Sequence, residues 1–329
     1  MKRGYRECEG FLIRENPRPS AAKLSFSTYS ETGEHLELTD RVREDGVLDL
    51  TAPAGQWRLW VVSRIAPIQT VKRPAPGNAG YALDPFSASA ISEYVKRFSD
   101  AFVGFPAPMP NAQFHESFEY FGADWTPGLF DAFQQKRGYD LRSQLPAFAG
   151  SGPDDVVKRV RCGYRETMSD LHLDYLNTWS DWAHAQGSLS RNQAHGSPGN
   201  LLDHYAAADI PEMEDYKQDR SILVMKFASA AAHTTGKPLV SSETGTWVKE
   251  HFTETLAGLK ALVDEFFLGG VNRVKFHGAA SSPSDVAWPG WMRNICPQSF
   301  PALATSRRGA RSSASNSPAL RSILTPMRW

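Results

Sequence analysis

The chain is organised around the stretch Asn192-Gln193-Ala194-His195-Gly196-Ser197-Pro198-Gly199-Asn200-Leu201-Leu202-Asp203, which continues through Ala208-Asp209-Ile210-Pro211-Glu212-Met213-Glu214. This stretch follows a short run typical of a strand, residues 188–191. Its glycines and prolines predict irregular backbone, neither a helix nor a central strand. Amides, an imidazole and carboxylates crowd this loop, and an α/β scaffold keeps its chemistry on such loops. We interpret the stretch as part of a functional site, with a solvated surface loop as the alternative.

Strands and helices alternate on both sides of this loop. The apolar, β-prone residues 57–64 suit a buried strand of a parallel sheet. Further strands are predicted at 112–119, 188–191, 237–243 and 271–278, and helices at 88–102, 127–137, 154–186, 217–234 and 252–268. This alternation predicts an α/β fold with a parallel sheet, and strand ends that carry polar groups favour a (β/α)8 TIM-barrel-like catalytic domain. Since fewer strands are found than a closed barrel needs, either further strands lie within the loops or, as we expect, the barrel is incomplete.

The two ends of the chain depart from this alternation. Residues 24–30 alternate apolar and polar side chains, and short strands at 36–38 and 47–50 follow, so residues 1–54 are expected to form a small N-terminal β segment. Residues 55–291 form the predicted barrel domain. Residues 292–329 lose hydrophobic periodicity and become rich in Ser, Ala and Arg, which predicts a disordered or non-native tail.

Composition excludes several classes of protein. The 329-residue chain has a net charge of zero, which argues against nucleic acid or an acidic membrane surface as a partner. Its three cysteines are far apart, so neither a zinc ribbon nor a disulfide framework is expected. No apolar run is long enough to span a bilayer, and the charged N-terminus lacks an apolar signal core. As written, the chain is expected in the cytoplasm, whereas an intact parent protein could be periplasmic or secreted.

Two glutamates, Glu119 and Glu243, close two different predicted strands. Paired carboxylates at a barrel mouth are the usual equipment of glycoside hydrolysis, one as acid and one as base or nucleophile. Salt-bridge partners or exposed residues are the alternative interpretation. The motifs of zinc proteases, dinucleotide enzymes, P-loop enzymes and α/β-hydrolases do not occur, which counts against those classes.

Several motifs together resemble the α-L-rhamnosidases of glycoside hydrolase family 106. Besides the opening stretch, they are Ser117-Phe118-Glu119 with Trp125-Thr126-Pro127, Arg137-Gly138-Tyr139-Asp140, Ser241-Ser242-Glu243-Thr244, His277-Gly278 with Ser282-Pro283, and Trp288-Pro289-Gly290-Trp291. The resemblance covers residues 55–291. It implies a (β/α)8 catalytic barrel, a rhamnose-containing oligosaccharide, polysaccharide or glycoside as substrate, inversion at the anomeric carbon, and a calcium ion near the sugar.

The resemblance implies a role for each matching carboxylate. Glu119 is expected to be the general acid, whose pKa must be raised for it to hold a proton, and Glu243 the base that activates water. Glu116 competes with Glu119 for the role of acid. The two residues are three positions apart and point to opposite faces of an extended strand, so only one faces the barrel mouth unless the strand ends between them.

The remaining site residues are also carried over from the resemblance. Calcium is expected to bind Glu212 or Glu214 together with Asp209, since their hard oxygen atoms suit that ion. The polar side chains expected to bind the sugar are Asn192, His195, Asn200 and His277. The aromatic faces of Trp125 and Trp247 would cover the apolar side of a 6-deoxy sugar.

Family members are much longer than this chain and carry additional β-domains, so the sequence is interpreted as a truncated enzyme. Two alternatives remain open. The first is a carbohydrate-binding remnant of such an enzyme, catalytically impaired. The second is a metal-assisted hydrolase that uses His195 and His277.

Overall fold

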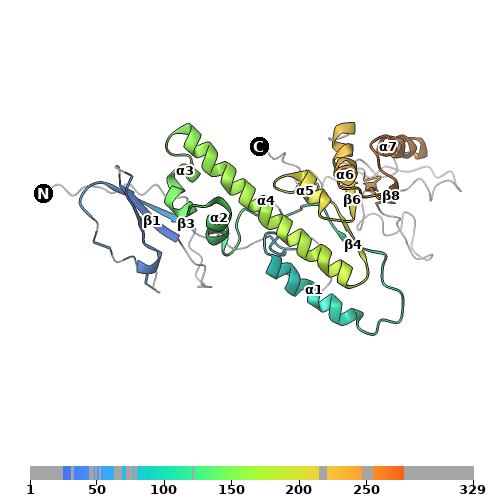
Figure 1. The fold of residues 1–329 in the computed structure, drawn as a ribbon, viewed down its shortest axis with the longest axis horizontal. Coiled ribbons are helices and arrows are strands. Elements are labelled where there is room, and N and C mark those ends of the chain that lie inside the picture. The colour runs from blue at the N-terminus through green and yellow to red at the C-terminus, as the bar shows by residue number, and fades with distance from the viewer. Residues whose placement is uncertain are drawn as a thin grey trace, which may run out of the picture.

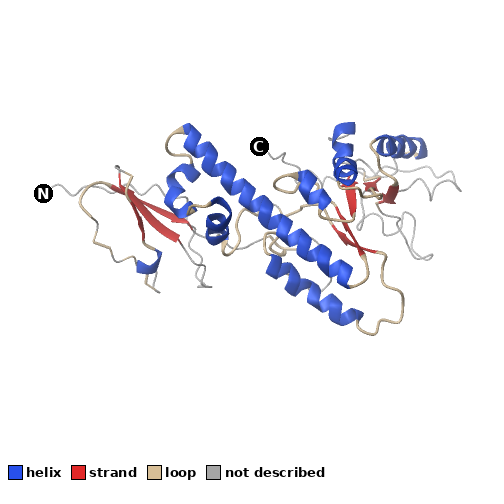
Figure 2. Cartoon of the chain, in the orientation of Figure 1, coloured by secondary structure: helices blue, strands red, loops and turns tan. Residues whose placement is uncertain are grey.

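The computed structural model of the chain describes residues 25–30, 33–43, 48, 50–51, 53–62, 69–71, 77, 80–120, 122–214, 221–246 and 255–277. A small antiparallel sheet lies at one end, a parallel sheet with its helices lies at the other, and one long helix runs between them (Figures 1 and 2). Among these residues, no helix has the length and apolar character needed to cross a bilayer.

The N-terminal sheet consists of three antiparallel strands. β1 (Ser25–Ser30) lies in the middle, between β2 (His35–Glu37) and β3 (Trp57–Val62). The assignment of residues 57–64 to the parallel sheet is therefore wrong. β3 is an edge strand with no fully buried residue, so its run of apolar side chains does not indicate burial on both faces. Between β1 and β3, Val42 and Leu48 form an isolated bridge after the short 3-10 helix η1 (Thr39–Arg41).

Tyr29 connects this sheet to the rest of the chain. Its hydroxyl donates to the carbonyl oxygen of Arg142, in the 3-10 helix η2 (Leu141–Gln144), and accepts from the Leu145 amide at 3.3 Å. Leu145 begins α3 (Leu145–Ala149), which packs on the long helix α4 (Asp154–Ala185). The predicted end of this long helix, residue 186, differs from the observed one by a single position.

Five parallel strands form the second sheet, in the order of the chain: β4 (Ala112–His115), β5 (Leu189–Asn192), β6 (Ile210–Glu214), β7 (Ser241–Thr244) and β8 (Arg273–Phe276). This curled sheet confirms the α/β class and is consistent with part of a barrel. Each neighbouring pair is also a pair of successive strands, so the carboxyl ends of all five meet at one edge.

Four further helices end at the predicted residues, whereas the predicted starts of two of them, residues 217 and 252, lie outside the described residues. They are α1 (Ala88–Phe102), α2 (Leu129–Arg137), α6 (Ile222–Thr234) and α7 (Leu256–Leu268). Gly138 ends α2 with a φ of 80°, as expected of a glycine that directly follows the predicted end of a helix at Arg137. Buried residues of α6 and α7 pack with Met213 of β6 in the largest apolar core cluster.

The opening stretch contains two regular elements, α5 (Leu201–Ala206) and β6, where irregular backbone was expected. Proline inside β6 made a central strand improbable because it has no N–H to donate. Its position explains the exception. The pairing of β6 with β5 ends at Pro211, and the pairing with β7 begins at Glu212, so Pro211 stands where the strand changes partner.

Candidate active site

Carboxylates gather where the parallel strands end. Glu116 and Glu119 follow β4, Glu212 and Glu214 lie on β6, and Glu243 lies on β7. Their charges act on one another: Glu243, Glu116 and Glu119 all raise the pKa of Glu214. We call these five residues the carboxylate cluster. The structure thus brings the two predicted catalytic residues, Glu119 and Glu243, to the same edge of the sheet.

Glu243 has a defined hydrogen-bonding partner for each carboxylate oxygen. Its side chain is 14% exposed. Oε2 accepts from the Gln193 amide Nε2 at 2.7 Å, and Oε1 accepts from the Thr246 hydroxyl at 3.0 Å. His277 lies beside both residues, because its Nδ1 is 2.9 Å from Thr246 Oγ1 and 3.5 Å from Glu243 Oε1. The predicted sugar-binding residue His277 therefore stands next to the predicted base.

Glu212 is occupied by contacts within the protein. It is 1% exposed, and Oε2 accepts from the Ser241 hydroxyl and lies 3.3 Å from Arg191 Nε. Gln193 Nε2 donates to the other oxygen at 3.2 Å. Burial raises the pKa of Glu212, while the hydrogen bond from Ser241 and the positive charge of Arg191 oppose that rise. Its carboxylate is held in place as a structural group.

β4 ends at His115, before both glutamates, whereas residues 112–119 were predicted as one strand. The alternation rule of an extended strand therefore does not separate Glu116 from Glu119. Glu116 accepts a hydrogen bond from the Ser117 amide at 3.0 Å and keeps part of its side chain in solvent. Desolvation raises the pKa of Glu116 to about 7, although the hydrogen bond from Ser117 lowers it. The charges of Glu243 and Glu119 add to the rise.

Glu214 is buried, and its Oε2 has no hydrogen-bond partner among the described residues. Desolvation raises the pKa of Glu214 to about 8, and the neighbouring carboxylates Glu243 and Glu116 add to the effect. The hydrogen bond from the Ser117 side chain opposes this rise in pKa without cancelling it, so the carboxyl group holds a proton at neutral pH unless a cation lies beside it.

Asp209 lies at the other end of β6 and does not join this cluster. Its Oδ2 accepts from the Ser190 amide at 2.8 Å and lies 2.6 Å from His184 Nε2. Since a strand rises about 3.3 Å per residue, Asp209 and Glu214 are roughly 16 Å apart. Asp209 and Glu214 are thus at opposite ends of β6, and the binding of calcium by these residues stays a prediction. No three His, Cys, Asp or Glu side chains are arranged to hold a metal ion in the part of the chain that the structure describes.

Two of the predicted sugar-binding residues have structural partners. Asn192 is buried at the end of β5, where Oδ1 is 2.9 Å from His115 Nδ1 and Nδ2 donates to the His204 carbonyl. Asn200 caps α5: its Oδ1 accepts from the Leu202 amide at 3.2 Å. The sequence did not predict this cap, because no helix was expected after Asn200.

His195 is partly exposed in the turn after β5, and its carbonyl oxygen accepts from the Phe118 amide at 2.9 Å. This bond joins the loop after β5 to the segment that carries Glu116 and Glu119. Trp125 packs against Phe130, with ring centroids 5.1 Å apart, beside a core cluster around α2. Trp247 lies outside the described residues.

α4 supports the loop after β5 through a buried histidine. The Nδ1 of His172 is 2.9 Å from the Pro85 carbonyl oxygen, and its Nε2 is 3.3 Å from the Ser197 hydroxyl. A carbonyl oxygen only accepts, so Nδ1 carries the proton and Nε2 accepts from Ser197. Desolvation lowers the pKa of His172 to about 3. The hydrogen bond to Pro85 opposes this change, whereas the charges of His204 and His115 lower the pKa further.

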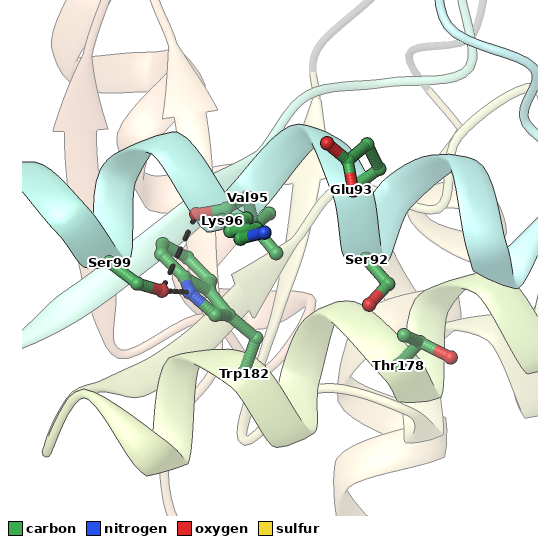
Figure 3. Close-up of a pocket in the computed structure, with 7 residues that line it drawn as sticks. All are labelled: Ser92, Glu93, Val95, Lys96, Ser99, Thr178 and Trp182. Atoms are coloured by element: carbon green, nitrogen blue, oxygen red, sulfur yellow. Dashed lines mark hydrogen bonds between the residues drawn. The ribbon is translucent and has the colours of Figure 1, made fainter.

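Sequence reasoning gave no role to Gln193, Thr246, Ser241 or Arg191, although the first two bind Glu243 and the others bind Glu212. The available signal was position, because Gln193 directly follows β5 and Thr246 lies two residues after β7. A hollow of about 270 Å³ does lie elsewhere, between α1 and α4, where Trp182 Nε1 donates to Ser99 Oγ at 2.8 Å (Figure 3). None of the predicted site residues lines it.

Comparisons with known proteins place the chain in a family. The model of the alpha-L-rhamnosidase family, glycoside hydrolase family 106, matches residues 5–311. The structure of a rhamnosidase from Novosphingobium sp. PP1Y is 29% identical with a TM-score of 0.65, over 78% of this chain and 26% of that chain. A Formosa agariphila protein provisionally named a beta-glucuronidase is 28% identical over 288 residues, 84% of this chain and 24% of that protein. The chain therefore spans about a quarter of the length of these relatives.

Proposed function

Since this chain belongs to glycoside hydrolase family 106, the α-L-rhamnosidases, we propose that it cleaves terminal α-L-rhamnosyl residues from a rhamnose-containing glycan or glycoside. The observation that carries the proposal is the carboxylate cluster at the carboxyl ends of the parallel strands. Glycoside hydrolysis needs one carboxylic acid and one carboxylate on opposite sides of the scissile bond, and this edge of the sheet holds candidates for both.

The proposed reaction inverts the anomeric carbon in a single displacement. A water oxygen bonds to that carbon while the water proton passes to the Glu243 carboxylate. The bond to the leaving oxygen breaks, and that oxygen takes a proton from the acid, Glu119. Glu243 suits the base because hydrogen bonds from Gln193 and Thr246 to its two oxygens hold the carboxylate in one orientation.

Glu116 remains the competing candidate for the acid. The pKa of Glu116, raised to about 7, matches the requirement that an acid hold its proton near neutral pH. Glu119 retains the family motif Ser117-Phe118-Glu119, and Gln69 fixes its backbone by donating to its carbonyl oxygen at 2.8 Å. The two assignments are separated by experiment below.

The base is tested with 4-nitrophenyl α-L-rhamnopyranoside and the purified chain. Glu243→Gln is expected to lower kcat by about 10²- to 10⁴-fold, since the amide cannot take the proton from water. Glu93→Gln on the exposed face of α1 is the matched control and should leave kcat unchanged. Equal rates for Glu243→Gln and the unchanged chain would remove Glu243 from the mechanism. Hydrolysis of the β-D-glucuronide instead of the rhamnoside would favour the activity for which the Formosa agariphila relative is named.

The acid is tested by changing the leaving group. 4-Nitrophenolate leaves readily without a proton, whereas a sugar alcohol does not, so loss of the acid should affect a rhamnosyl disaccharide far more than the aryl glycoside. Glu119→Gln is expected to show this difference and Glu116→Gln to lack it. The reverse pattern would assign the acid to Glu116. Proton NMR of the first product should show the β anomer, and the α anomer would contradict inversion.

A carbohydrate-binding protein without turnover is the second candidate, because the chain spans only about a quarter of its relatives. It predicts calorimetric binding of L-rhamnose by a chain that hydrolyses no rhamnoside. Calcium is a further proposal that rests on the unpartnered Oε2 of Glu214, and no step of the reaction is assigned to the ion. Calcium should then raise the melting temperature of the unchanged chain but not that of Glu214→Gln.

A further inference from the structure

Gln193 lies between two carboxylates that belong to different strands. Its amide Nε2 donates to Glu243 Oε2 at 2.7 Å and to Glu212 Oε1 at 3.2 Å. The side chain is buried, with 1% of the residue exposed, and it directly follows β5. The backbone N–H of Gln193 donates to the carbonyl oxygen of His115 at 3.0 Å. The last residue of β4 therefore fixes the backbone from which the Gln193 side chain extends.

Chemistry fixes the orientation of this amide. If the Gln193 amide were flipped, its carbonyl oxygen would face two carboxylates. Carbonyl and carboxylate oxygens only accept, so no hydrogen bond could form. Only the –NH2 group, with its two hydrogens, satisfies both partners at once. In this orientation the Gln193 carbonyl oxygen is buried without a partner among the described residues. Burial of the unpaired carbonyl oxygen costs free energy, and the two hydrogen bonds from the –NH2 group to the carboxylates offset that cost.

Glu212 is itself held firmly, so Gln193 is anchored at its far end. Arg191 and Ser241 both contact Glu212 Oε2, which leaves Oε1 for Gln193. The hydrogen bond from Gln193 also lowers the pKa of Glu212, against the larger effect of burial. An unbroken series of polar contacts therefore runs from Arg191 through Glu212 and Gln193 to Glu243.

We infer that Gln193 is a positioning residue of the hydrolytic reaction, which fixes the Glu243 carboxylate through Oε2 and turns its Oε1 side toward the attacking water. The inference rests on the proposed function, since it requires Glu243 to be the base. The bond to Oε2 restricts rotation of the carboxylate. A neutral side chain with two N–H groups is required here, because a carboxylate between Glu212 and Glu243 would have no hydrogen to donate to either of them.

The test replaces Gln193 with Glu, which has nearly the same shape, and with Met, which has no donor. Gln193→Met is expected to lower kcat for the aryl rhamnoside by about 10- to 100-fold at every pH, with KM nearly unchanged. Gln193→Glu is expected to lose more activity at pH 8 than at pH 5. At the lower pH the new carboxyl group carries a proton that it can donate to Glu243, and at the higher pH it repels the base.

Gln113→Glu is the matched control. Gln113 also donates from Nε2, to Ser188 Oγ at 3.2 Å, but it lies on β4 away from the carboxylate cluster. It should keep the pH profile and kcat of the unchanged chain. Circular dichroism identifies any variant that fails to fold. Folded Gln193 variants with the kcat and pH profile of the unchanged chain would overturn the inference.

A second measurement requires no turnover, so it separates this inference from the proposed function. Carbon-13 NMR of labelled glutamate side chains follows the protonation of each carboxyl group. In Gln193→Met the pKa of Glu212 is expected to rise, because a hydrogen bond that lowers it is removed. If the unchanged chain hydrolyses no rhamnoside and this rise is still seen, the proposed function fails while the contact stands. An unchanged titration of Glu212 contradicts the contact itself.

Discussion

Glu214 shows what a single buried carboxyl group does to the stability of the whole chain. The group is 9% exposed, and its pKa is raised to about 8 in the folded state. A carboxyl with a raised folded pKa contributes stability that is fully present below its unfolded value, near pH 4, and is lost as pH rises through the folded value. The relevant window is therefore about pH 4 to 8.

Glu214→Gln is expected to remove this dependence, since a neutral amide of the same shape does not titrate. Between pH 5 and pH 8 the unchanged chain should lose more free energy of unfolding than the variant, by a few kcal/mol at most on the scale of about 1.4 kcal/mol per pKa unit. Urea unfolding at the two pH values measures the difference. Parallel pH curves for the two proteins would show that Glu214 ionises normally.

His172 produces the opposite slope. Because burial lowers its pKa to about 3, the neutral ring contributes stability above the unfolded value, near pH 6.5, that is lost as pH falls. His172→Gln should lose less free energy of unfolding between pH 7 and pH 4 than the unchanged chain does. His233→Gln, at an exposed position on α6, is the control and should follow the unchanged chain. An equal slope for His172→Gln would mean that the ring is solvated.

At the scale of elements, regular helices were predictable and short strands were not. The bounds of α1 were predicted without error because Ser87 provides a cap and Ile91, Val95 and Phe102 keep helical spacing. β6 was missed because Pro211 argued against it, and only the change of strand partner at that residue makes it tolerable. β3 was assigned to the wrong sheet because an apolar run does not reveal which strands pair with it.

The sequence predicted the candidate catalytic glutamates but not the hydrogen bonds that hold them. The sequence placed Glu243 correctly on a strand of the parallel sheet, whereas Glu119 lies four residues after the end of β4 and not on the strand predicted for residues 112–119. The hydrogen bond of Gln193 to Glu243 was not visible in the sequence, because it joins residues 50 positions apart through the pairing of strands. The separation of Asp209 from Glu214 could not be predicted either, because the strand that lies between them, β6, was not predicted.

The N-cap of α1 provides a prediction at this scale. The Ser87 hydroxyl accepts from the Ala90 amide at 3.1 Å, which satisfies a donor that the helix leaves open. Ser87→Ala should therefore destabilise the chain by about 1 kcal/mol in urea unfolding. Ser92→Ala, at an exposed position inside the same helix, is the control and should be neutral or slightly stabilising. A loss of equal size for both serines would show that the cap contributes nothing.

For the whole molecule, exposed apolar side chains on the helices around the parallel sheet matter most. Leu268 of α7 is 72% exposed and Leu223 of α6 is 70% exposed, on a chain with a net charge of zero. Both conditions favour self-association. Leu268→Lys is expected to lower the apparent mass in light scattering at high protein concentration.

The control adds the same charge at a polar site. Ser92→Lys on α1 is exposed and changes no apolar surface, so it isolates the effect of charge alone. A decrease in apparent mass as large as that of Leu268→Lys would assign the association to the lack of net charge. No decrease in either variant would show that the chain is monodisperse.

The long helix α4 has a consequence for motion in solution. Its 32 residues extend about 48 Å, and the antiparallel sheet lies near one end of it and the parallel sheet near the other (Figure 1). An elongated body experiences more friction than a sphere of the same mass and rotates faster about its long axis than across it. The chain should therefore sediment more slowly than a compact protein of 36.5 kDa, and amide relaxation along α4 should differ from that of helices that lie across it.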